Sequence, residues 1–386
     1  MLADWQVSAH ISPWQNAPMN LHVRKLPYEI ASVSSLIGEV VSIDEWAQRA
    51  QLPSRHGAGA LDGATLKRLL GIEGKSWDPK LFADMDASVV RTARAALASA
   101  RVRPSDLEAV IVVTSTPYEV MFDQDAFRLM RALGVPDHVP PIQLGSGCAG
   151  LARAMTVASQ LRAGTVLVVA YCLASLVTGD GEGGVGAQYR KNEHHPCGRT
   201  LWSSPALFSD AACALVLRRS EKQEGAVVYS RDSLRFGDEA GFPDPLMHYP
   251  GGAGRHPTGT PNADAYCCYG MSAPHIKRYY EQGMLLNHQA LSAVDPEYGK
   301  RVRRIYTHQA SPALVSHFQR TSGLPEEKMP TNVREFGNLV SPCTMKLLDD
   351  DLAQGRVAPD DLVCVSVVGG GPERGAFFAR LRIESV

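Results

Sequence analysis

Residues 145–150 read Gly-Ser-Gly-Cys-Ala-Gly, and the fold of the chain can be worked out from this stretch outward. An apolar, extended segment at 142–144 precedes it, and a helical pattern follows it. A cysteine at the start of a helix meets unpaired N–H groups and the positive end of the helix dipole, and both favour the thiolate. We therefore interpret Cys148 as a nucleophile, although the stretch by itself fits a buried structural cysteine at a tight turn equally well.

Strands and helices alternate on both sides of this cysteine. The runs at 109–113 and 165–170 are continuously apolar and rich in β-branched residues, which is typical of strands buried on both faces of a parallel sheet. Helical patterns occupy 86–102 and 123–133, and the helix after the cysteine is expected to end at Gly164. The recurring order of strand, helix and strand predicts an α/β fold.

The last third of the chain repeats this arrangement. Strands are predicted at 304–307 and 362–368, and a helix is predicted to open at Asn338. Asn338 thus takes the place that Cys148 has in the middle of the chain. The spacing from the strand to the helix start is also similar, 37 residues in the middle and 33 residues here.

Such a repeat indicates two duplicated α/β halves around a pseudo-two-fold axis, 1–220 with the cysteine and 221–386. Cys148, His308 and Asn338 would then lie in one crevice, because α/β folds bind ligands where strands end and helices begin. Each residue alone also has an ordinary explanation. His308 could be a satisfied core or surface histidine, and Asn338 could be a helix cap.

The composition excludes some classes of function. The 386 residues are 45% apolar, and the 39 basic and 40 acidic residues leave a net charge of -1, so no general attraction to nucleic acid or to an anionic membrane is expected. The eight cysteines follow no disulfide framework, which favours a reducing compartment. The longest apolar run, at about 165–177, is too short to span a bilayer. We expect a soluble, cytoplasmic protein.

Five motifs together resemble a known family. They are GSGCAG at 145–150, LFSDAACALVL at 207–217, THQAS at 307–311, GNLVSPCT at 337–344 and VVGGGPERGAFFARL at 367–381. In this order and at this spacing, from about residue 27 to the C-terminus, the chain resembles the ketoacyl-ACP synthase III group of the thiolase superfamily. The resemblance implies a five-layer αβαβα fold, a homodimer, and no metal or redox cofactor.

The resemblance also implies a role for each residue of the site. Cys148 would take an acyl group from acyl-CoA or acyl-ACP. His308 and Asn338 would hydrogen-bond the carbonyl of a malonyl-type thioester, which loses CO2 and attacks the acyl group. The backbone N–H groups of Cys148 and Gly370 would hold the oxyanion. The triple glycine at 369–371 could also be no more than a loop.

Two other functions remain open on the same scaffold. The acyl group on Cys148 could pass to a hydroxyl, an amine or a second thioester without condensation, or the chain could be a catalytically silent subunit of a larger synthase. Asn338 favours condensation, because decarboxylation needs the pair of hydrogen-bond donors, and the intact Cys-His-Asn set argues against a silent subunit. Ser311, where the family often has Asn, and long loops at 178–205 and 249–262 indicate a specialised substrate, as in secondary metabolism.

Several further residues carry weaker signals. Phe122 is expected to line an acyl tunnel. Glu119, in a segment that in the family reaches the acyl pocket or the dimer partner, could act as an extra base, although a solvated helix start is the more ordinary explanation. The basic cluster at 300–304 could receive a phosphopantetheine phosphate or an acidic carrier protein, or could simply be solvated. His-His-Pro-Cys at 194–197 resembles half of a zinc site but has no second pair at ligand spacing.

Overall fold

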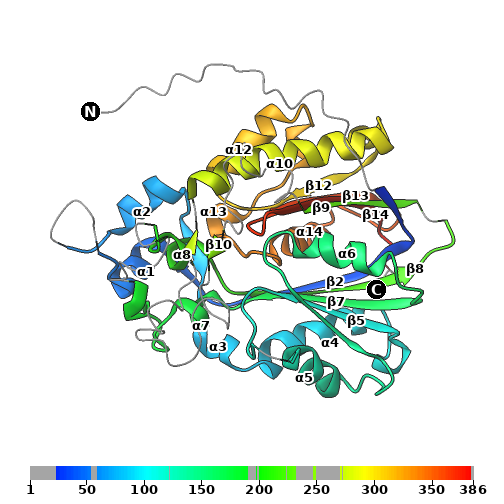
Figure 1. Ribbon diagram of the computed structural model, residues 1–386, viewed down its shortest axis with the longest axis horizontal. Helices are drawn as coiled ribbons and strands as arrows, with labels where there is room; N and C mark the ends of the chain where they lie inside the picture. The colour runs from blue at the N-terminus through cyan, green and yellow to red at the C-terminus, as the bar shows by residue number, and fades with distance from the viewer. Residues whose placement is uncertain are drawn as a thin grey trace.

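The structure is a computed structural model, and its elements form five layers (Figure 1). Two five-stranded sheets lie face to face with two helices between them, and further helices cover the outer face of each sheet. This confirms the αβαβα arrangement that the family resemblance implied. The described residues are 23–53, 59–120, 122–189, 197, 200–222, 224–231, 247–248, 270–271 and 273–383.

The first sheet has the strand order β2-β8-β7-β5-β6. Strand β5 pairs in parallel with β6 and β7, whereas β8 runs antiparallel to both β7 and β2. Every residue of β5 is buried, as its continuous apolar sequence predicted. The five strands are β2 (Tyr28–Ile37), β5 (Ala109–Thr114), β6 (Pro141–Gly145), β7 (Thr165–Cys172) and β8 (Ala211–Arg219).

The second sheet has the order β1-β9-β14-β13-β12 and repeats the first, because β12 pairs in parallel with β13 and β14 runs antiparallel to β13. The two sheets do not divide cleanly at residue 220. Strand β1, near the N-terminus, pairs with β9 and so belongs to the second sheet. The five strands are β1 (Val23–Leu26), β9 (Gly225–Arg231), β12 (Arg304–Thr307), β13 (Leu362–Gly369) and β14 (Glu373–Arg380).

Two helices, α6 (Gly150–Ala158) and α14 (Cys343–Ala353), fill the layer between the sheets. Both are apolar on more than one face, since each helix contacts sheet residues above and below it. Met155 of α6 and Met345 of α14 belong to one buried cluster that also includes strands of both sheets. The central layer therefore places the starts of both helices at the same end of the sandwich.

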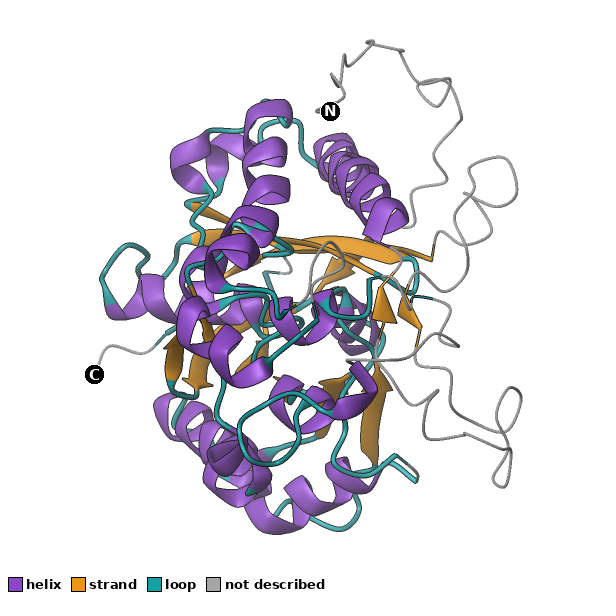
Figure 2. Ribbon diagram, turned by 90° about the vertical axis from the view of Figure 1, so that its left-hand side faces the viewer, coloured by secondary structure: helices purple, strands orange, loops and turns teal. Residues whose placement is uncertain are grey.

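The outer helices cover the free faces of the sheets, as Figure 2 shows from the side. Helices α4 and α5 pack on the first sheet, and α10 packs on the second sheet with α12 beside it. The long helix expected at 86–102 is present, but its first part is a π-helical turn at Asp86–Val90. The outer helices are α4 (Arg91–Ser99), α5 (Gln124–Leu133), α10 (Ala273–Val294) and α12 (Pro312–Thr321).

A small unit at one end of the sandwich contains β3, α1, α2, β4 and α3 (left in Figure 1). Ser42 caps α1 by accepting a hydrogen bond from the Glu45 N–H, and Gly71 ends α2 in the left-handed conformation. The elements are β3 (Val40–Ser42), α1 (Ile43–Ala50), α2 (Gly63–Leu70), β4 (Gly74–Ser76) and α3 (Pro79–Ala83).

The remaining elements are short and connect these layers. They are α7 (Ala174–Thr178), α8 (Ser203–Leu207), β10 (Met247–His248), β11 (Gly270–Met271), α11 (Tyr298–Arg301) and α13 (Val333–Phe336). Within the described part of the chain, no helix is long and apolar enough to cross a membrane.

Two predicted helix boundaries are wrong. Helix α6 ends at Ala158 rather than at Gly164, because the chain turns tightly after Ser159 to reach β7. Asn338 does not open a helix. It pairs with a neighbouring backbone segment instead, and α14 begins five residues later, at Cys343. Periodicity gives the apolar face of a helix but leaves its ends to local tertiary contacts.

Candidate active site

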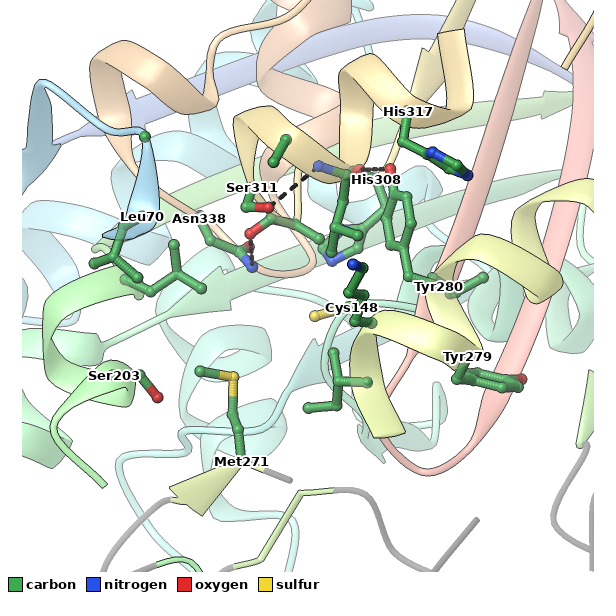
Figure 3. A pocket seen from close by; sticks show the side chains of 18 of the residues that line it. Leu70, Cys148, Ser203, Met271, Tyr279, Tyr280, His308, Ser311, His317 and Asn338 are labelled. Atoms are coloured by element: carbon green, nitrogen blue, oxygen red, sulfur yellow. Dashed lines mark hydrogen bonds between the residues drawn. The ribbon is translucent and has the colours of Figure 1, made fainter. Parts of the chain in front are cut away.

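A pocket of about 560 Å³ lies at the end of the sandwich where the central helices begin. Cys148, His308 and Asn338 all line it, together with Gly369 and Gly370 (Figure 3). The sequence thus correctly predicted that the cysteine, the histidine and the asparagine share one crevice. Apolar residues from α2, α8, α10 and α12 complete the wall, among them Leu70, Leu207, Ile276 and Leu314.

Cys148 lies in the turn between β6 and α6 and is partly exposed to the pocket. The Gly150 N–H donates to the Gly147 carbonyl oxygen at 2.8 Å and closes the turn. Gly150 is required here, because a Cβ at this position would lie 2.3 Å from Cγ1 of Val113 on β5. The Gly147 carbonyl also accepts a hydrogen bond from the Ser341 hydroxyl of the second half. Contacts from both halves therefore hold the turn.

The resting thiol of Cys148 is protonated. Burial raises its pKa well above the usual value, and the nearby Cys343 and Cys172 act in the same direction. The expectation that the helix start would favour the thiolate is therefore wrong in its net effect. Helix α6 begins two residues later, at Gly150, and desolvation by the surrounding side chains outweighs the helix dipole.

His308 follows the last residue of β12 and is almost completely buried, with 3% of its surface exposed. Its backbone N–H donates to the Ser366 carbonyl oxygen at 2.9 Å, and its carbonyl oxygen accepts from the Tyr280 hydroxyl at 2.8 Å. Burial lowers the pKa of the imidazole to about 3. The ring is therefore neutral at physiological pH and can donate one hydrogen bond without bringing a charge.

Asn338 is held by the backbone of the LFSDAACALVL motif. Its N–H donates to the Leu207 carbonyl oxygen at 2.9 Å, and its carbonyl oxygen accepts from the Ser209 N–H at 3.0 Å. The side-chain oxygen accepts from the Val340 N–H at 2.8 Å, which fixes the amide group. Val340 has a positive φ of 59°, a strained conformation for a β-branched residue. Sequence reasoning missed these supports.

The triple glycine approaches the nucleophile directly. A Cβ at Gly369 would lie 2.9 Å from the backbone nitrogen of Ala149, so no larger residue fits without a shift. Glu373, just after this loop, is buried and accepts hydrogen bonds from the hydroxyls of Ser146 and Tyr229. Arg153 of α6 forms an ion pair with the same carboxylate at 2.6 Å. Glu373 therefore ties the glycine loop to the start of α6, a link that the sequence did not reveal.

Phe122, Glu119 and the basic cluster at 300–304 are not among the residues that line this pocket. Phe122 is 77% exposed, and Glu119 is exposed as well, so neither lines the pocket of its own chain. The basic cluster at 300–304 also lies elsewhere, and its side chains pair with neighbours such as Asp295 and Asp351. The reason is topological: Glu119, Val120 and Phe122 are exposed residues of the connection between β5 and α5, and the cluster lies at the start of β12, opposite the end that carries His308.

Basic residues do line the pocket, but from other elements. Arg68 of α2, Lys277 of α10 and Arg320 of α12 are exposed lining residues, with Glu281 the acidic one. Ser311, which replaces the asparagine of many family members, also lines the pocket and accepts from the Leu314 N–H as the N-cap of α12.

Some predictions fall outside what the structure describes. The loop at 249–262 lies entirely in an undescribed segment, and the loop at 178–205 is described only in part. His194 and His195 also lie outside the described residues. Among the described residues there is no group of three or more potential metal ligands.

The comparisons with known proteins agree with this geometry. A family profile described as 3-oxoacyl-[acyl-carrier-protein (ACP)] synthase III C terminal matches residues 299–381, which include His308 and Asn338. The β-ketoacyl-[acyl-carrier-protein] synthase III 3 of Streptomyces coelicolor is 28% identical over 296 residues, which cover 74% of this chain and 80% of that protein. The chain is a ketoacyl-ACP synthase III-like protein of the thiolase superfamily.

Two further similarities extend over more of the chain. The acetoacetyl CoA synthase NphT7 of Streptomyces sp. strain CL190 is 26% identical over 321 residues, 81% of this chain and 88% of that protein. The structure of 3-oxoacyl-(acyl carrier protein) synthase III, FabH, from Pseudomonas aeruginosa PAO1 has a TM-score of 0.70 and 19% identity, and the match covers 93% of this chain and all of the other. The ketoacyl-ACP synthase III-like chain thus has the thiolase fold and is an enzyme of the acyltransferase class.

Proposed function

We propose that this enzyme loads an acyl group onto Cys148 and condenses it, with loss of CO2, with a malonyl-type thioester. The observation that supports this best is the meeting of Cys148, His308, Asn338 and Gly370 on one pocket, although they come from four separate parts of the chain. A nucleophile, two neutral hydrogen-bond donors and a backbone N–H are the groups that this chemistry needs.

In the loading step the sulfur of Cys148 attacks the thioester carbonyl of acyl-CoA or acyl-ACP. The new bond between the acyl carbon and the sulfur of Cys148 replaces the bond between the acyl carbon and the carrier sulfur. The proton of the Cys148 thiol is taken up by the released carrier thiol. The oxyanion formed on the way accepts hydrogen bonds from the N–H groups of Cys148 and Gly370. Because burial raises the pKa of Cys148, proton transfer accompanies the attack rather than preceding it.

In the condensing step His308 and Asn338 donate hydrogen bonds to the thioester carbonyl of the malonyl group. Loss of CO2 leaves an enolate whose negative charge rests on this carbonyl oxygen. The enolate carbon attacks the acyl carbonyl, and the sulfur of Cys148 departs and takes up a proton. Two neutral donors suit this role, and the pKa of His308, about 3, keeps the ring neutral throughout the physiological range.

The second candidate is acyl transfer from Cys148 to a hydroxyl, an amine or another thioester, without a new carbon–carbon bond. The position of Asn338 favours condensation over this reaction. Its amide is fixed by the Val340 N–H at the expense of a strained backbone, and simple acyl transfer has no evident need for a second donor of this kind.

The exposed cations of the pocket suggest how the thioester carrier is held. Arg68, Lys277 and Arg320 come from three different helices and line one opening. A CoA or a phosphopantetheine arm carries phosphate groups, and the basic side chains would attract them while the apolar wall accepts the pantetheine chain. The basic cluster predicted from the sequence would take no part in this contact.

We further propose a homodimer in which the turn around Phe122, in the connection between β5 and α5, meets the second copy. Val120 is 81% exposed and Phe122 is 77% exposed, which is unusual for neighbouring large apolar side chains. Buried Asp125 accepts from the Tyr118 and Glu119 N–H groups and so holds the base of the turn in place. The expected roles of Phe122 in an acyl tunnel and of Glu119 as an extra base would then apply to the partner's pocket.

The proposal includes a specialised starter acyl group, as in secondary metabolism, and a cytoplasmic location where acyl thioesters are made. Ser311 supports the specialised starter, because it stands three positions after His308, where many family members have an asparagine. A panel of starters tests this point: equal rates with acetyl-CoA and with larger or aromatic starters would argue against a specialised substrate.

Intact-protein mass spectrometry tests the main proposal. Wild-type protein is incubated with acyl-CoA and acyl-ACP donors and then with malonyl-CoA or malonyl-ACP. We expect the mass of one acyl group on the wild type, none on Cys148→Ala, and its discharge together with CO2 release on addition of the malonyl thioester. An equal mass gain on the variant would refute the covalent mechanism. Discharge without CO2 would favour simple acyl transfer.

A further inference from the structure

We propose that Cys343, the first residue of α14, donates its S–H proton to Nδ1 of His308 and thereby keeps the ring proton on Nε2. This makes Cys343 a positioning residue that acts through His308. The inference deepens the proposed function and rests on it in one respect. The position of the ring proton matters for catalysis because, in the proposed reaction, Nε2–H donates a hydrogen bond to the substrate carbonyl.

The contact is short and lies in the protein interior. Cys343 Sγ is 3.3 Å from His308 Nδ1, which is within the range of a hydrogen bond to sulfur. Cys343 is completely buried and His308 has 3% of its surface exposed, so no solvent competes for this contact. Among the described residues, no other side chain or backbone group hydrogen-bonds the ring of His308.

The direction of the hydrogen bond follows from the two protonation states. Burial raises the pKa of the Cys343 thiol to about 12, and burial lowers that of His308 to about 3, so the sulfur keeps its proton and the ring carries one proton. A ring nitrogen is a good acceptor, whereas a thiol sulfur is a poor one. Backbone N–H groups of Gln309 and Thr344 are already directed at this sulfur. The S–H group is therefore the donor, and Nδ1 is the acceptor.

The proton state of Nδ1 decides what the other nitrogen can do. With Nδ1 accepting, Nε2 carries the proton and can donate to a developing oxyanion in the pocket. With the proton on Nδ1, Nε2 would be bare and could act only as an acceptor or base. The backbone at His308 is fixed separately, by the Tyr280 hydroxyl on its carbonyl oxygen and by Ser366 on its N–H. Cys343 therefore has its effect on the proton rather than on the position of the chain.

Two substitutions at this position separate the hydrogen bond from packing. Cys343→Ser keeps a donor of similar size, and Cys343→Ala removes the donor. Cys364→Ala is the matched control, because Cys364 is also a completely buried cysteine of the second half, on β13, whereas the thiol paired with the His308 ring is that of Cys343. Thermal unfolding of all three variants shows which of them are folded.

The first readout is independent of activity. In protein labelled with ¹⁵N-histidine, the ring signals of His308 are identified by their absence in His308→Gln. We expect the pattern of the Nε2–H form in the wild type, in Cys343→Ser and in Cys364→Ala, and a mixture of both neutral forms in Cys343→Ala. An unchanged pattern in Cys343→Ala, or a wild type in the Nδ1–H form, would overturn the inference.

The second readout compares the two half-reactions. We expect Cys343→Ala to lower the rate of malonyl decarboxylation by the acyl-enzyme about 10- to 100-fold, consistent with the loss of one oriented donor, while acyl loading changes by less than about 3-fold. Cys343→Ser should restore decarboxylation. If the ¹⁵N pattern is as expected but no variant affects decarboxylation, the role of His308 in the proposed function fails, while its tautomer stands. Equal loss in Cys343→Ala and Cys343→Ser would instead point to packing and refute the inference.

Discussion

The two halves of the molecule use the same strand-and-helix unit in different ways. In the first half, β6 runs almost directly into α6, and only the glycine-rich turn around Cys148 separates them. In the second half, helix α13 rather than a strand precedes the segment 337–342 that leads into α14. The first turn exposes one sulfur to the pocket, whereas the second segment brings Asn338 there. The difference shows that one unit can present either a nucleophile or a hydrogen-bond donor, depending on the residues before its central helix.

The supports of the two turns also differ. At the cysteine turn, close packing of glycine backbone adds to the hydrogen bonds on the Gly147 carbonyl, because both Gly150 and Gly369 would clash with neighbouring atoms if they carried a Cβ. Hydrogen bonds hold the asparagine segment, from Leu207 and Ser209 on its backbone and from Val340 on its side chain. Substitutions should therefore affect the first turn through sterics and the second through lost hydrogen bonds.

The largest expected effect is at the nucleophile. Cys148→Ala should lower condensation by at least about 10⁴-fold, since loss of a covalent nucleophile removes the acyl-enzyme route entirely. The measurement is steady-state formation of the condensed product, with Cys172→Ala as a control at a buried cysteine of β7. Activity of Cys148→Ala within 10-fold of the wild type would mean that the first turn does not carry the nucleophile.

The next effect concerns the second turn. Asn338→Ala should reduce malonyl decarboxylation about 10²- to 10³-fold, as loss of one oxyanion donor does elsewhere, while Cys148 is still acylated. Single-turnover measurements of loading and of CO2 release separate the two steps. Asn332→Ala, six residues earlier and outside the pocket, controls for loss of a buried asparagine. A loss confined to the loading step would contradict the assignment of donors to the second turn.

A smaller effect is expected where the two halves touch. Gly369→Ala places a Cβ 2.9 Å from the Ala149 nitrogen and should displace the glycine loop, lowering condensation about 10- to 100-fold through a misplaced oxyanion donor. Gly371→Ala is the matched control in the same loop, because its Cβ would meet atoms only at 3.8 Å or beyond. Kinetic measurements that find the two variants equally active would show that close approach at Gly369 is not needed.

The last expected effect is on stability rather than on activity, and it comes from His308. Because burial lowers its pKa to about 3 in the folded state, the folded protein disfavours the protonated ring. Stability should be full above about pH 6.5, the pKa of an unfolded histidine, and should fall as the pH drops from there toward 3, by up to about 1.4 kcal/mol per unit. Urea unfolding at several pH values checks this. In His308→Gln this part of the loss of stability at low pH should be absent. If the free energy of unfolding of the variant depended on pH as steeply as that of the wild type, the prediction would be contradicted.

Most of the fold could be predicted because its signals are local. The continuous apolar runs of β5, β7 and β13 follow from burial on both faces, and Ser42 and Gly71 mark helix ends through their own backbone preferences. The pocket could be predicted in part, since the repeat of the two halves brings Cys148 and His308 to one end. The position of Phe122 could not, because it depends on which way the connection between β5 and α5 turns.

The sequence by itself determined the layered α/β fold, the duplication and the set of residues that meet in the pocket, since periodicity and spacing encode these directly. Only the tertiary structure decided their chemical state. Desolvation protonates Cys148 and keeps His308 neutral, and a cysteine 35 residues away along the chain contacts Nδ1 of that histidine. These properties depend on what surrounds a side chain in three dimensions, and no local pattern of residues records that.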